Sequence, residues 1–248
     1  MEKNEKRSFI YGLRATTEAL ESGHSIDKVL IKKGLKGTLF QKLFSRIREY
    51  GIPFQFVPSR KLDNISRKNH QGVIAFLSPV DFYRVEEVLP GLYERGKNPF
   101  LLLLDGLTDV RNFGAILRTA ECAGVHAVVI PKKNFARISE DTAKTSAGAL
   151  YRIPVCRSDN LEDVVEYLKK SGVQVVGVTE KAGSLYNEMD LQKPSALVMG
   201  AEDKGISPGL LQKMHFLARI PLSGEIESLN VSVAAGIMLY EVVRQRSL

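Results

Sequence analysis

Asn112 and Arg118 stand six positions apart in the run D-V-R-N-F-G-A-I-L-R-T-A (109–120), directly after the apolar stretch 100–104. This order predicts a buried strand followed by a turn and a helix. We expect Arg118 on the inner part of that helix, where a guanidinium is costly to bury unless it has a partner or a task. The fork of an arginine suits oxyanions and phosphates, so the task would be to bind one of them.

Two later segments supply groups with which Arg118 could work. In L-V-M-G-A-E-D-K-G (197–205), Gly200 and Gly205 bracket Glu202, and glycines allow backbone to approach a ligand closely. The same pattern is typical of an ordinary turn with a surface acid. The segment A-R-I-P-L-S-G-E (218–225) ends another strand and is by itself plain loop chemistry.

The third block is S-L-N-V-S (228–232), which leads into an apolar helix. Ser228 is a good candidate for the N-cap of that helix. Asn230 is unexpected in a first turn because asparagine is a poor former of helix interiors. It indicates either a polar contact from that turn or a second cap.

The elements that must position these blocks alternate regularly from Pro99 onward, which is typical of a parallel sheet covered by helices on both faces. Ligand sites in such sheets lie beyond the carboxyl ends of the strands, where all three blocks begin. The expected strands are 100–104, 125–130, 153–156, 173–178, 195–199 and 217–221, and the expected helices are 112–123, 139–149, 160–170, 207–214 and 229–245.

Residues 1–79 predict a small α/β domain of their own. Helices are expected at Tyr11 to Ser22 and over the apolar face that runs from 39 to 47, and strands at 26–31, 54–57 and 73–77. Three prolines and two glycines punctuate residues 78–99, which favours a linker over 80–98 with a short helix near 85–92. The catalytic domain would then be 99–248.

The charge of the chain divides at the same place. Residues 1–80 hold 15 Lys and Arg against 7 Asp and Glu, whereas 81–248 hold 20 against 21, so the net charge of +7 comes from the first domain. A localised basic region is typical of a surface that binds a polyanion. A lysine-rich solvated surface is the plain alternative.

Several classes of function are disfavoured. The sequence has no G-x-G-x-x-G after a strand, no G-x-x-x-x-G-K-[ST], no H-E-x-x-H and no G-x-S-x-G, and its four histidines form no metal pattern. Cys122 and Cys156 lack C-x-x-C spacing, which suits a reducing cytoplasm. No uninterrupted apolar run exceeds five residues, and the charged start of the chain is unlike a signal peptide, so we expect a cytoplasmic protein without metal or membrane partner.

Taken together, the three blocks resemble the SpoU (TrmH) branch of the SPOUT RNA methyltransferases. N-F-G-A-I-L-R matches the first family motif, L-V-M-G-A-E-D-K-G the second, and S-L-N-V-S-V-A-A-G-I-M-L-Y-E the third. The resemblance covers 100–245 without a gap. The first domain is similar to a ribosomal-protein-like substrate domain, and its segments Y-G-L-R-A-T-T-E-A-L-E-S-G and N-H-Q-G-V look like the members that methylate a guanosine ribose in 23S rRNA.

The resemblance implies a fold, a cofactor and a set of site residues. The fold would carry a deep C-terminal trefoil knot, an exception to unthreaded connections, and the protein would be a homodimer with active sites at the interface. The cofactor would be S-adenosylmethionine, held by Gly200, Ile220 and Leu229 together with Gly205 and Pro221. The catalytic group would comprise Arg118, Asn112, Glu202, Ser228 and Asn230.

The reaction would transfer a methyl group to a ribose 2′-hydroxyl. The family's proposal makes Arg118 the base, but arginine stays protonated at neutral pH, so we favour stabilisation of the developing 2′-oxyanion and a neighbouring phosphate. Glu202 would hold Arg118 or orient the nucleotide. RNA contacts are expected from the polar run at Arg67, Lys68, Asn69, His70 and Gln71 and from Lys32, Lys33 and Lys36.

Other substrates and one other class of protein remain open. The RNA would alternatively be a tRNA guanosine or, as in the antibiotic-resistance enzymes with the same layout, an rRNA adenosine. A non-catalytic RNA-binding assembly factor is the alternative from a different class, although Asn112, Arg118, Glu202 and Asn230 are all in place.

Overall fold

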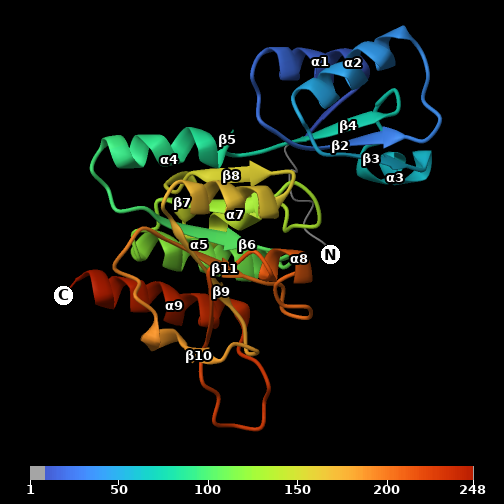
Figure 1. Ribbon diagram of the computed structural model, residues 1–248. Coiled ribbons are helices and arrows are strands. Elements are labelled where there is room, and N and C mark those ends of the chain that lie inside the picture. The colour runs from blue at the N-terminus through green and yellow to red at the C-terminus, as the bar shows by residue number, and fades with distance from the viewer. Residues whose placement is uncertain (1–8, 248) are drawn as a thin grey trace. The chain divides into compact units, whose positions relative to one another are not determined.

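The computed structural model describes residues 9–247, which divide by their contacts into two units at Asp81 and Phe82. The first unit is a four-stranded sheet in the order β1-β4-β2-β3, in which only β2 and β3 are parallel. Figure 1 shows α1 and α2 together on one side of this sheet and α3 on the other. Its elements are β1 (Phe9–Tyr11), α1 (Leu13–Glu21), β2 (Ile26–Lys32), α2 (Thr38–Glu49), β3 (Phe54–Val57), α3 (Ser59–Ile65) and β4 (Val73–Leu77).

The second unit is built on eight strands in the order β10-β12-β9-β11-β6-β7-β8-β5, and every pairing is parallel. The fold class expected from the sequence is confirmed. The strands are β5 (Phe82–Tyr83), β6 (Phe100–Leu104), β7 (Ala127–Pro131), β8 (Val155–Ser158), β9 (Gln174–Val178), β10 (Ser184–Leu185), β11 (Ser195–Met199) and β12 (Phe216–Arg219).

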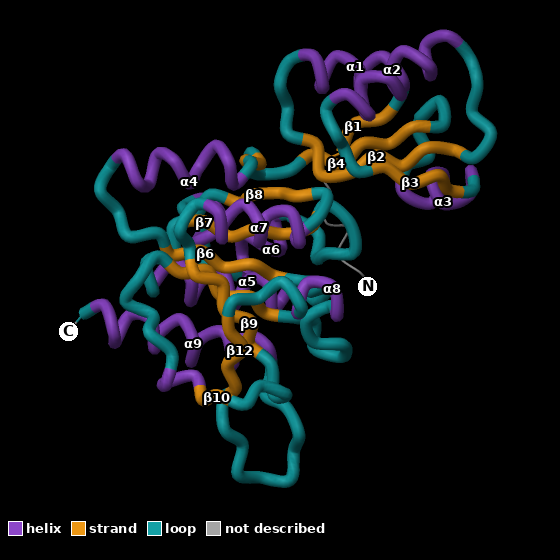
Figure 2. Tube along the Cα trace, in the orientation of Figure 1, coloured by secondary structure: helices purple, strands orange, loops and turns teal. Residues whose placement is uncertain are grey.

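Helices cover both faces of this sheet, as the layers of Figure 2 show. One face packs against α4, α7 and α8 through a continuous apolar core, and α5, α6 and α9 pack together on the other. The central strands β6 and β11 are buried along their whole length, which explains why β6 is entirely apolar and why β11 is apolar after Ser195. The helices are α4 (Val85–Glu94), α5 (Val110–Cys122), α6 (Glu140–Thr145), α7 (Leu161–Lys170), α8 (Pro208–Leu211) and α9 (Val231–Arg246), with short 3₁₀ turns at Ala149–Tyr151 and Tyr186–Glu188.

Residues 82–94, within the expected linker 80–98, form β5 and α4, so the short helix expected near 85–92 is present. Strand β5 pairs with β8, and Val85, Leu89 and Leu92 are buried in the core of the second unit. Pro90 lies inside α4 on its exposed side, where water can satisfy the carbonyl that loses its partner. Burial of the apolar face therefore outweighs the cost of a proline within the helix.

Two histidines join neighbouring strands at the amino end of the second sheet. His126 precedes β7; its backbone N–H donates to Phe100 O and its Nδ1 accepts from Phe100 N at 3.0 Å. His215 precedes β12 and makes the same pair of bonds with Val175, with Nδ1 at 3.1 Å from the amide nitrogen. Each imidazole thus takes the place of a backbone acceptor, and Nδ1 must be unprotonated to do so.

Arg246, in the last turn of α9, closes the same end of the sheet. Its guanidinium donates to four carbonyl oxygens, those of Asn98, Pro99, Leu191 and Lys193, at 2.6–3.2 Å. Burial lowers the pKa of Arg246. The end of the chain is therefore tied to the start of β6 and to the segment before β11.

Candidate active site

The loop after β11 is closed by its own backbone. Ala201 and Gly205 exchange two hydrogen bonds, at 3.1 and 2.8 Å, and Gly205 has φ of 64°. A Cβ on Gly200 would overlap the backbone of Gly205 and Ile206. Both glycines are therefore required by the shape of the loop itself, which the sequence pattern alone left open between a ligand loop and an ordinary turn.

This loop forms one wall of a cavity of about 360 Å³ beyond the carboxyl ends of β9, β11 and β12. The volume lies in the range of small-molecule and cofactor sites. Three segments of chain supply the lining, at 178–181, 199–205 and 220–234. Six residues expected from the sequence lie on it, namely Gly200, Glu202, Gly205, Ile220, Ser228 and Leu229, whereas Pro221 is not among the lining residues.

Three further residues that line the cavity were not predicted from the sequence, namely Thr179, Glu180 and Lys181. They follow β9 directly, so the rule that ligand sites lie at carboxyl ends of parallel strands would have found them. They were overlooked because V-T-E-K carries no glycine and no recognised motif.

A trio of polar side chains links the three sequence blocks. Asn112 donates through Nδ2 to Glu202 Oε1, and Asn230 Nδ2 donates to Asn112 Oδ1 at 3.2 Å. The residues are 90 and 118 positions apart in sequence. Asn112 is held in turn by the start of α5, where the Asp109 carboxylate accepts from the backbone of Arg111 at 2.6 Å and Asn112 at 3.1 Å. The expectation that these blocks converge is therefore met for Asn112, Glu202 and Asn230.

Arg118 departs from the expectation. Its side chain is exposed on α5, not buried, and it forms no ion pair or hydrogen bond within residues 9–247. Glu202 accepts from Asn112 instead of holding Arg118. Six residues along a helix correspond to about 9 Å of rise and a rotation of about 240°, so Asn112 and Arg118 face different sides of α5.

The N-cap of α9 also differs from the prediction made from the sequence. Asn230, not Ser228, is the N-cap, since its Oδ1 accepts from Ser232 N at 2.8 Å and the helix begins at Val231. One asparagine therefore does two things at once: its oxygen caps α9 and its nitrogen holds Asn112. Both alternatives that the sequence left open for Asn230, a polar contact and a cap, are therefore found in the structure.

Gly114, the glycine of the first motif, does not line the cavity. A Cβ there would overlap the side chain of Thr145 on α6, and Thr145 Oγ1 is fixed by Asp141 O at 2.8 Å. The glycine therefore lets α5 and α6 pack closely and so sets the position of the whole motif.

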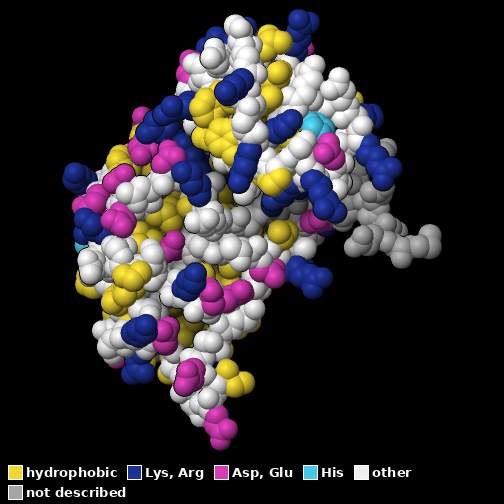
Figure 3. Space-filling view, turned by 90° about the vertical axis from the view of Figure 1, so that its right-hand side faces the viewer, with side chains coloured by type: hydrophobic (Ala, Val, Ile, Leu, Met, Phe, Trp, Pro, Cys, Tyr) yellow, Lys and Arg dark blue, Asp and Glu magenta, His cyan; other side chains and the backbone are white. Residues whose placement is uncertain are grey.

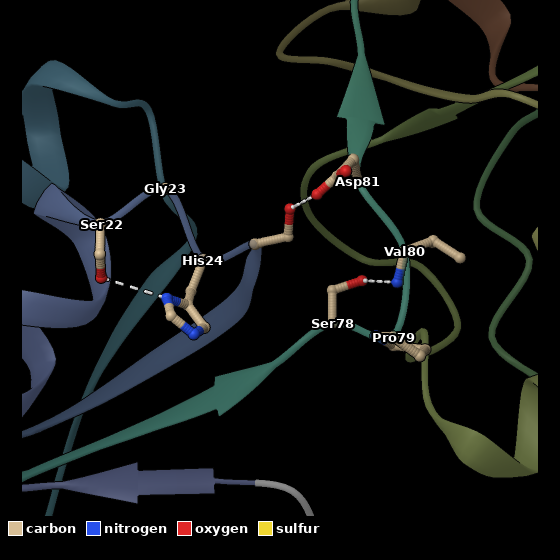
Figure 4. A pocket seen from close by; sticks show the side chains of 8 residues that line it. Ser22, Gly23, His24, Ser78, Pro79, Val80 and Asp81 are labelled. Carbon is tan, nitrogen blue, oxygen red and sulfur yellow. Dashed lines mark hydrogen bonds between the residues drawn. The ribbon is translucent and has the colours of Figure 1, made fainter.

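A second hollow, of about 380 Å³, lies in the first unit between 22–25 and 78–81. Figure 4 shows His24 turned toward Ser22, with Nδ1 3.2 Å from its hydroxyl, while Ser25 donates to Asp81. The histidine does not touch the serine that the acid binds, so these groups form no nucleophilic triad. Among residues 9–247, no group of three or more His, Cys, Asp or Glu could hold a metal ion. Burial raises the pKa of the Cys156 thiol to about 12 and makes it a poor nucleophile.

Basic side chains gather where β1, β2 and β3 end in the first unit. Lys32 N donates to Gly72 O at 2.8 Å and Lys33 N to Val57 O at 2.9 Å, which joins the three loops at this end. We call this the basic end; its exposed cations are Arg14, Lys32, Lys33, Lys36, Arg60, Lys61, Arg67 and Lys68.

Two residues expected to contact RNA here have internal roles. His70 is buried, with Nε2 3.0 Å from Asp63 Oδ1 and Nδ1 accepting from Gly72 N at 3.0 Å. Gln71 has φ of 49°, and its Oε1 accepts from Leu13 N at the start of α1 at 3.1 Å. Both side chains shape the loop, while Arg67 and Lys68 remain exposed.

No helix within 9–247 combines the length and apolarity that crossing a bilayer requires. Two family models match the chain: one described as the SpoU rRNA Methylase family over residues 99–240, and one described as RNA 2′-O ribose methyltransferase substrate binding over 9–83. The chain is 35% identical over 98% of both chains to a Bacillus subtilis (strain 168) protein whose name places it in the TrmH family of tRNA/rRNA methyltransferases. A Staphylococcus saprophyticus protein with the same family name is 38% identical over 96% of both chains.

Solved structures agree with these matches. The AdoMet-bound rRNA methyltransferase from Sinorhizobium meliloti superposes with a TM-score of 0.62 at 27% identity, covering 98% of this chain and 89% of that one. The SpoU methyltransferase AviRb from Streptomyces viridochromogenes, in complex with AdoMet, has the same fold, with a TM-score of 0.62 at 22% identity over 96% of this chain and 90% of that one. The chain belongs to the SpoU (TrmH) family of RNA methyltransferases.

Proposed function

We propose that this protein transfers a methyl group from S-adenosylmethionine to a ribose 2′-hydroxyl of RNA, with a guanosine of 23S rRNA as the substrate. The observation that carries the proposal is the cavity at the carboxyl ends of β9, β11 and β12, whose wall includes Glu202 of the trio Asn112–Glu202–Asn230. Family membership and the AdoMet-bound structures of similar proteins support the same reaction.

The lining of the cavity fits the cofactor. Met199, Ile220, Leu222 and Leu229 offer apolar surface for an adenine ring, and the backbone around Gly200 offers hydrogen-bonding groups at close approach. Glu180, Glu202 and Glu227 also line the cavity, and their carboxylates suit a cationic sulfonium. When bound, S-adenosylmethionine supplies an electrophilic methyl group to the ribose oxygen.

Arg118 acts in this proposal as an electrostatic clamp. Its guanidinium is exposed and unpaired within the described residues, so it is available to a phosphate and to the 2′-oxyanion that forms as the hydroxyl gives its proton to solvent water. Asn112 and Asn230 hold Glu202 and the cofactor loop in place.

Because Asn112 and Arg118 face different sides of α5, we propose that the complete site forms between two copies of the chain. Val233 and Tyr240 on α9 are each 51% exposed, and Leu222, Ile226 and Leu229 add apolar surface beside the cavity. Exposed apolar side chains on the same unit support a homodimer. The trefoil knot implied by the family belongs to the same proposal, and the packing of α9 against both α5 and β11 is consistent with it.

RNA is bound in this proposal by the exposed cations of the basic end, including Lys32, Lys33, Arg67 and Lys68. His70 and Gln71 are left out because their side chains are engaged within the loop. A cytoplasmic location fits an RNA substrate and the two free thiols.

The test is transfer of labelled methyl from S-adenosylmethionine to RNA, followed by mapping of 2′-O-methyl sites in rRNA and tRNA from cells without the protein. Loss of one guanosine methylation in 23S rRNA is expected. Loss at a tRNA position with intact rRNA would assign the protein to tRNA, and loss at an rRNA adenosine would assign it to the resistance type. Binding of cofactor and RNA without any transfer would favour the assembly factor.

A further inference from the structure

Four phenylalanines form a cluster on one face of the first unit that the proposed active site does not use. Phe44 on α2 is the centre: its ring lies 5.5 Å from that of Phe40, 5.1 Å from Phe54 and 5.9 Å from Phe56. Phe54 and Phe56 are two positions apart on β3, so their side chains lie on the same face of the sheet, the one that α2 covers. We call these four residues the aromatic strip.

The aromatic strip is only partly covered. Phe54 is 39% exposed and Phe56 is 42% exposed, although each packs on Phe44. β3 is an edge strand, so no further strand of the described chain lies beside them. A hollow of about 710 Å³ borders Phe40 and Phe44 on α2. Burial of aromatic side chains is favourable, so exposed aromatic rings that cluster in this way indicate a surface that binds a ligand.

Cations stand at both ends of the strip. Phe40, Phe44 and Arg48 follow one another at intervals of four along α2, so Arg48 continues the same row, and it lines the same hollow. Arg48 forms no ion pair within residues 9–247, whereas Arg46 on the neighbouring row is paired with Glu49 at 2.8 Å. At the other end, the Lys33 N–H donates to Val57 O at 2.9 Å, which places the lysine loop 32–37 beside the end of β3.

We propose that the aromatic strip stacks unpaired bases of the RNA substrate, while Arg48 at one end and the loop with Lys33 and Lys36 at the other bind the adjoining phosphates. Exposed rings two residues apart on a strand, flanked by cations, match what single-stranded RNA offers: successive flat bases on a charged backbone. An uncharged protein strand would match the edge of β3 but not the cations. Figure 3 shows hydrophobic side chains at the surface with lysine and arginine side chains close around them. The proposal rests on the proposed function only in that its ligand is the RNA.

The test measures binding of two fluorescent probes, a single-stranded oligouridine and an abasic oligomer of equal length, to the full-length protein. The double variant Phe54→Leu and Phe56→Leu keeps apolar contact with Phe44 but removes two stacking faces. We expect binding of oligouridine to weaken about tenfold or more and binding of the abasic oligomer to stay unchanged. Phe216→Leu is the matched control, because Phe216 is 49% exposed in the second unit.

The variant Arg48→Gln should reduce the slope of log K against log salt for oligouridine by about 0.7. The proposal is overturned if the double variant, with an unchanged unfolding temperature, binds oligouridine like the wild type, or if both probes lose affinity equally. It is also overturned if the double variant binds oligouridine normally but loses self-association in sedimentation, which would make the strip an interface between copies. Base-dependent binding without methyl transfer by the wild type would sink the proposed function and leave the strip standing.

Discussion

The two ends of the eight-stranded sheet are built in opposite ways. At the amino end, His126 and His215 accept hydrogen bonds from neighbouring strands through Nδ1, and Arg246 donates to four carbonyl oxygens. The polar side chains there are therefore hydrogen-bonded to the backbone. At the carboxyl end, Glu202 and Ser228 are exposed around an open cavity. Polar side chains at the amino end therefore stabilise the fold, whereas those at the carboxyl end are available to a ligand.

The contrast separates polar side chains that stabilise the fold from polar side chains that are available to a ligand. A side chain whose donors and acceptors are all satisfied by backbone contributes to stability. One whose groups face a cavity contributes little to folding and remains available to a ligand. Substitutions at the carboxyl end should therefore change ligand binding or catalysis, and substitutions at the amino end should change stability. Four experiments test this difference.

The largest effect is expected from Gly200→Ala at the carboxyl end. The new Cβ would overlap the backbone of Gly205, so the loop must open and the cavity wall is lost. We expect affinity for S-adenosylmethionine to fall more than about 100-fold by calorimetry, that is, by more than about 2.7 kcal/mol. Gly183→Ala is the control, since a Cβ there meets nothing within 4 Å. Unchanged cofactor affinity in Gly200→Ala would show that the loop does not form the binding wall.

Arg246→Ala should have the largest effect at the amino end. The variant leaves four carbonyl oxygens without their charged donor, and we expect the free energy of unfolding in urea to fall by about 3 kcal/mol. Arg152→Ala, which removes an exposed pair with Glu121 at 3.6 Å, should cost less than about 1 kcal/mol. Equal losses in the two variants would contradict the division between the two ends.

Arg118→Gln should lower the rate of methyl transfer about 100-fold while leaving the free energy of unfolding within about 0.5 kcal/mol, because the side chain is exposed and unpaired. A pH–rate profile of Arg118→Lys adds a second readout. Activity that persists with a new ionisation in the lysine range would mean that residue 118 accepts a proton, and the electrostatic clamp would then be wrong.

The smallest effect concerns pH and stability. Burial, and then the nearby positive charges of Arg246, Lys97 and Arg95, lower the pKa of His126, and burial lowers that of His215. The neutral form is favoured in the fold, so this stability is fully present above the unfolded pKa of about 6.5 and is lost as pH falls below it. Urea unfolding between pH 7 and pH 5 should show a loss of about 1 kcal/mol, mostly from His126 because solvent screens the exposed His215, and the loss should be smaller in His126→Gln. An equally steep loss in that variant would assign the acid sensitivity elsewhere.

Local sequence patterns predicted the parts of the fold that depend on local burial. The strands at 54–57, 73–77, 100–104 and 195–199 match β3, β4, β6 and β11. β1 and α3 were missed because each is short and α3 buries only Leu62, which leaves no periodic signal. The bonds from Asn112 to Glu202 and Asn230 join residues about a hundred positions apart, and no spacing rule predicts such a pair.

The exposure of Arg118 was mispredicted for a related reason. Its neighbours Leu117 and Ile116 are buried, so the pattern suggests an inner face, but a residue one position away on a helix turns by about 100° and leaves the core. The cap of α9 was predicted two residues early because Ser228 and Asn230 are both good caps, and only the start of the helix at Val231, with Ser232 N donating to Asn230, distinguishes them.

The close approach of α5 to α6 at Gly114 has a consequence at the level of the gene. Every codon for glycine begins with two guanines, and each single-base change that alters the amino acid introduces a residue with a Cβ or stops the chain. At Gly114 that Cβ would overlap the side chain of Thr145 and lie 3.0 Å from its backbone carbonyl carbon, so even a glycine at position 145 would leave a tight contact. A compensating change at position 145 would relieve the overlap only in part. We expect mutagenesis libraries selected for activity to return only synonymous codons at this position.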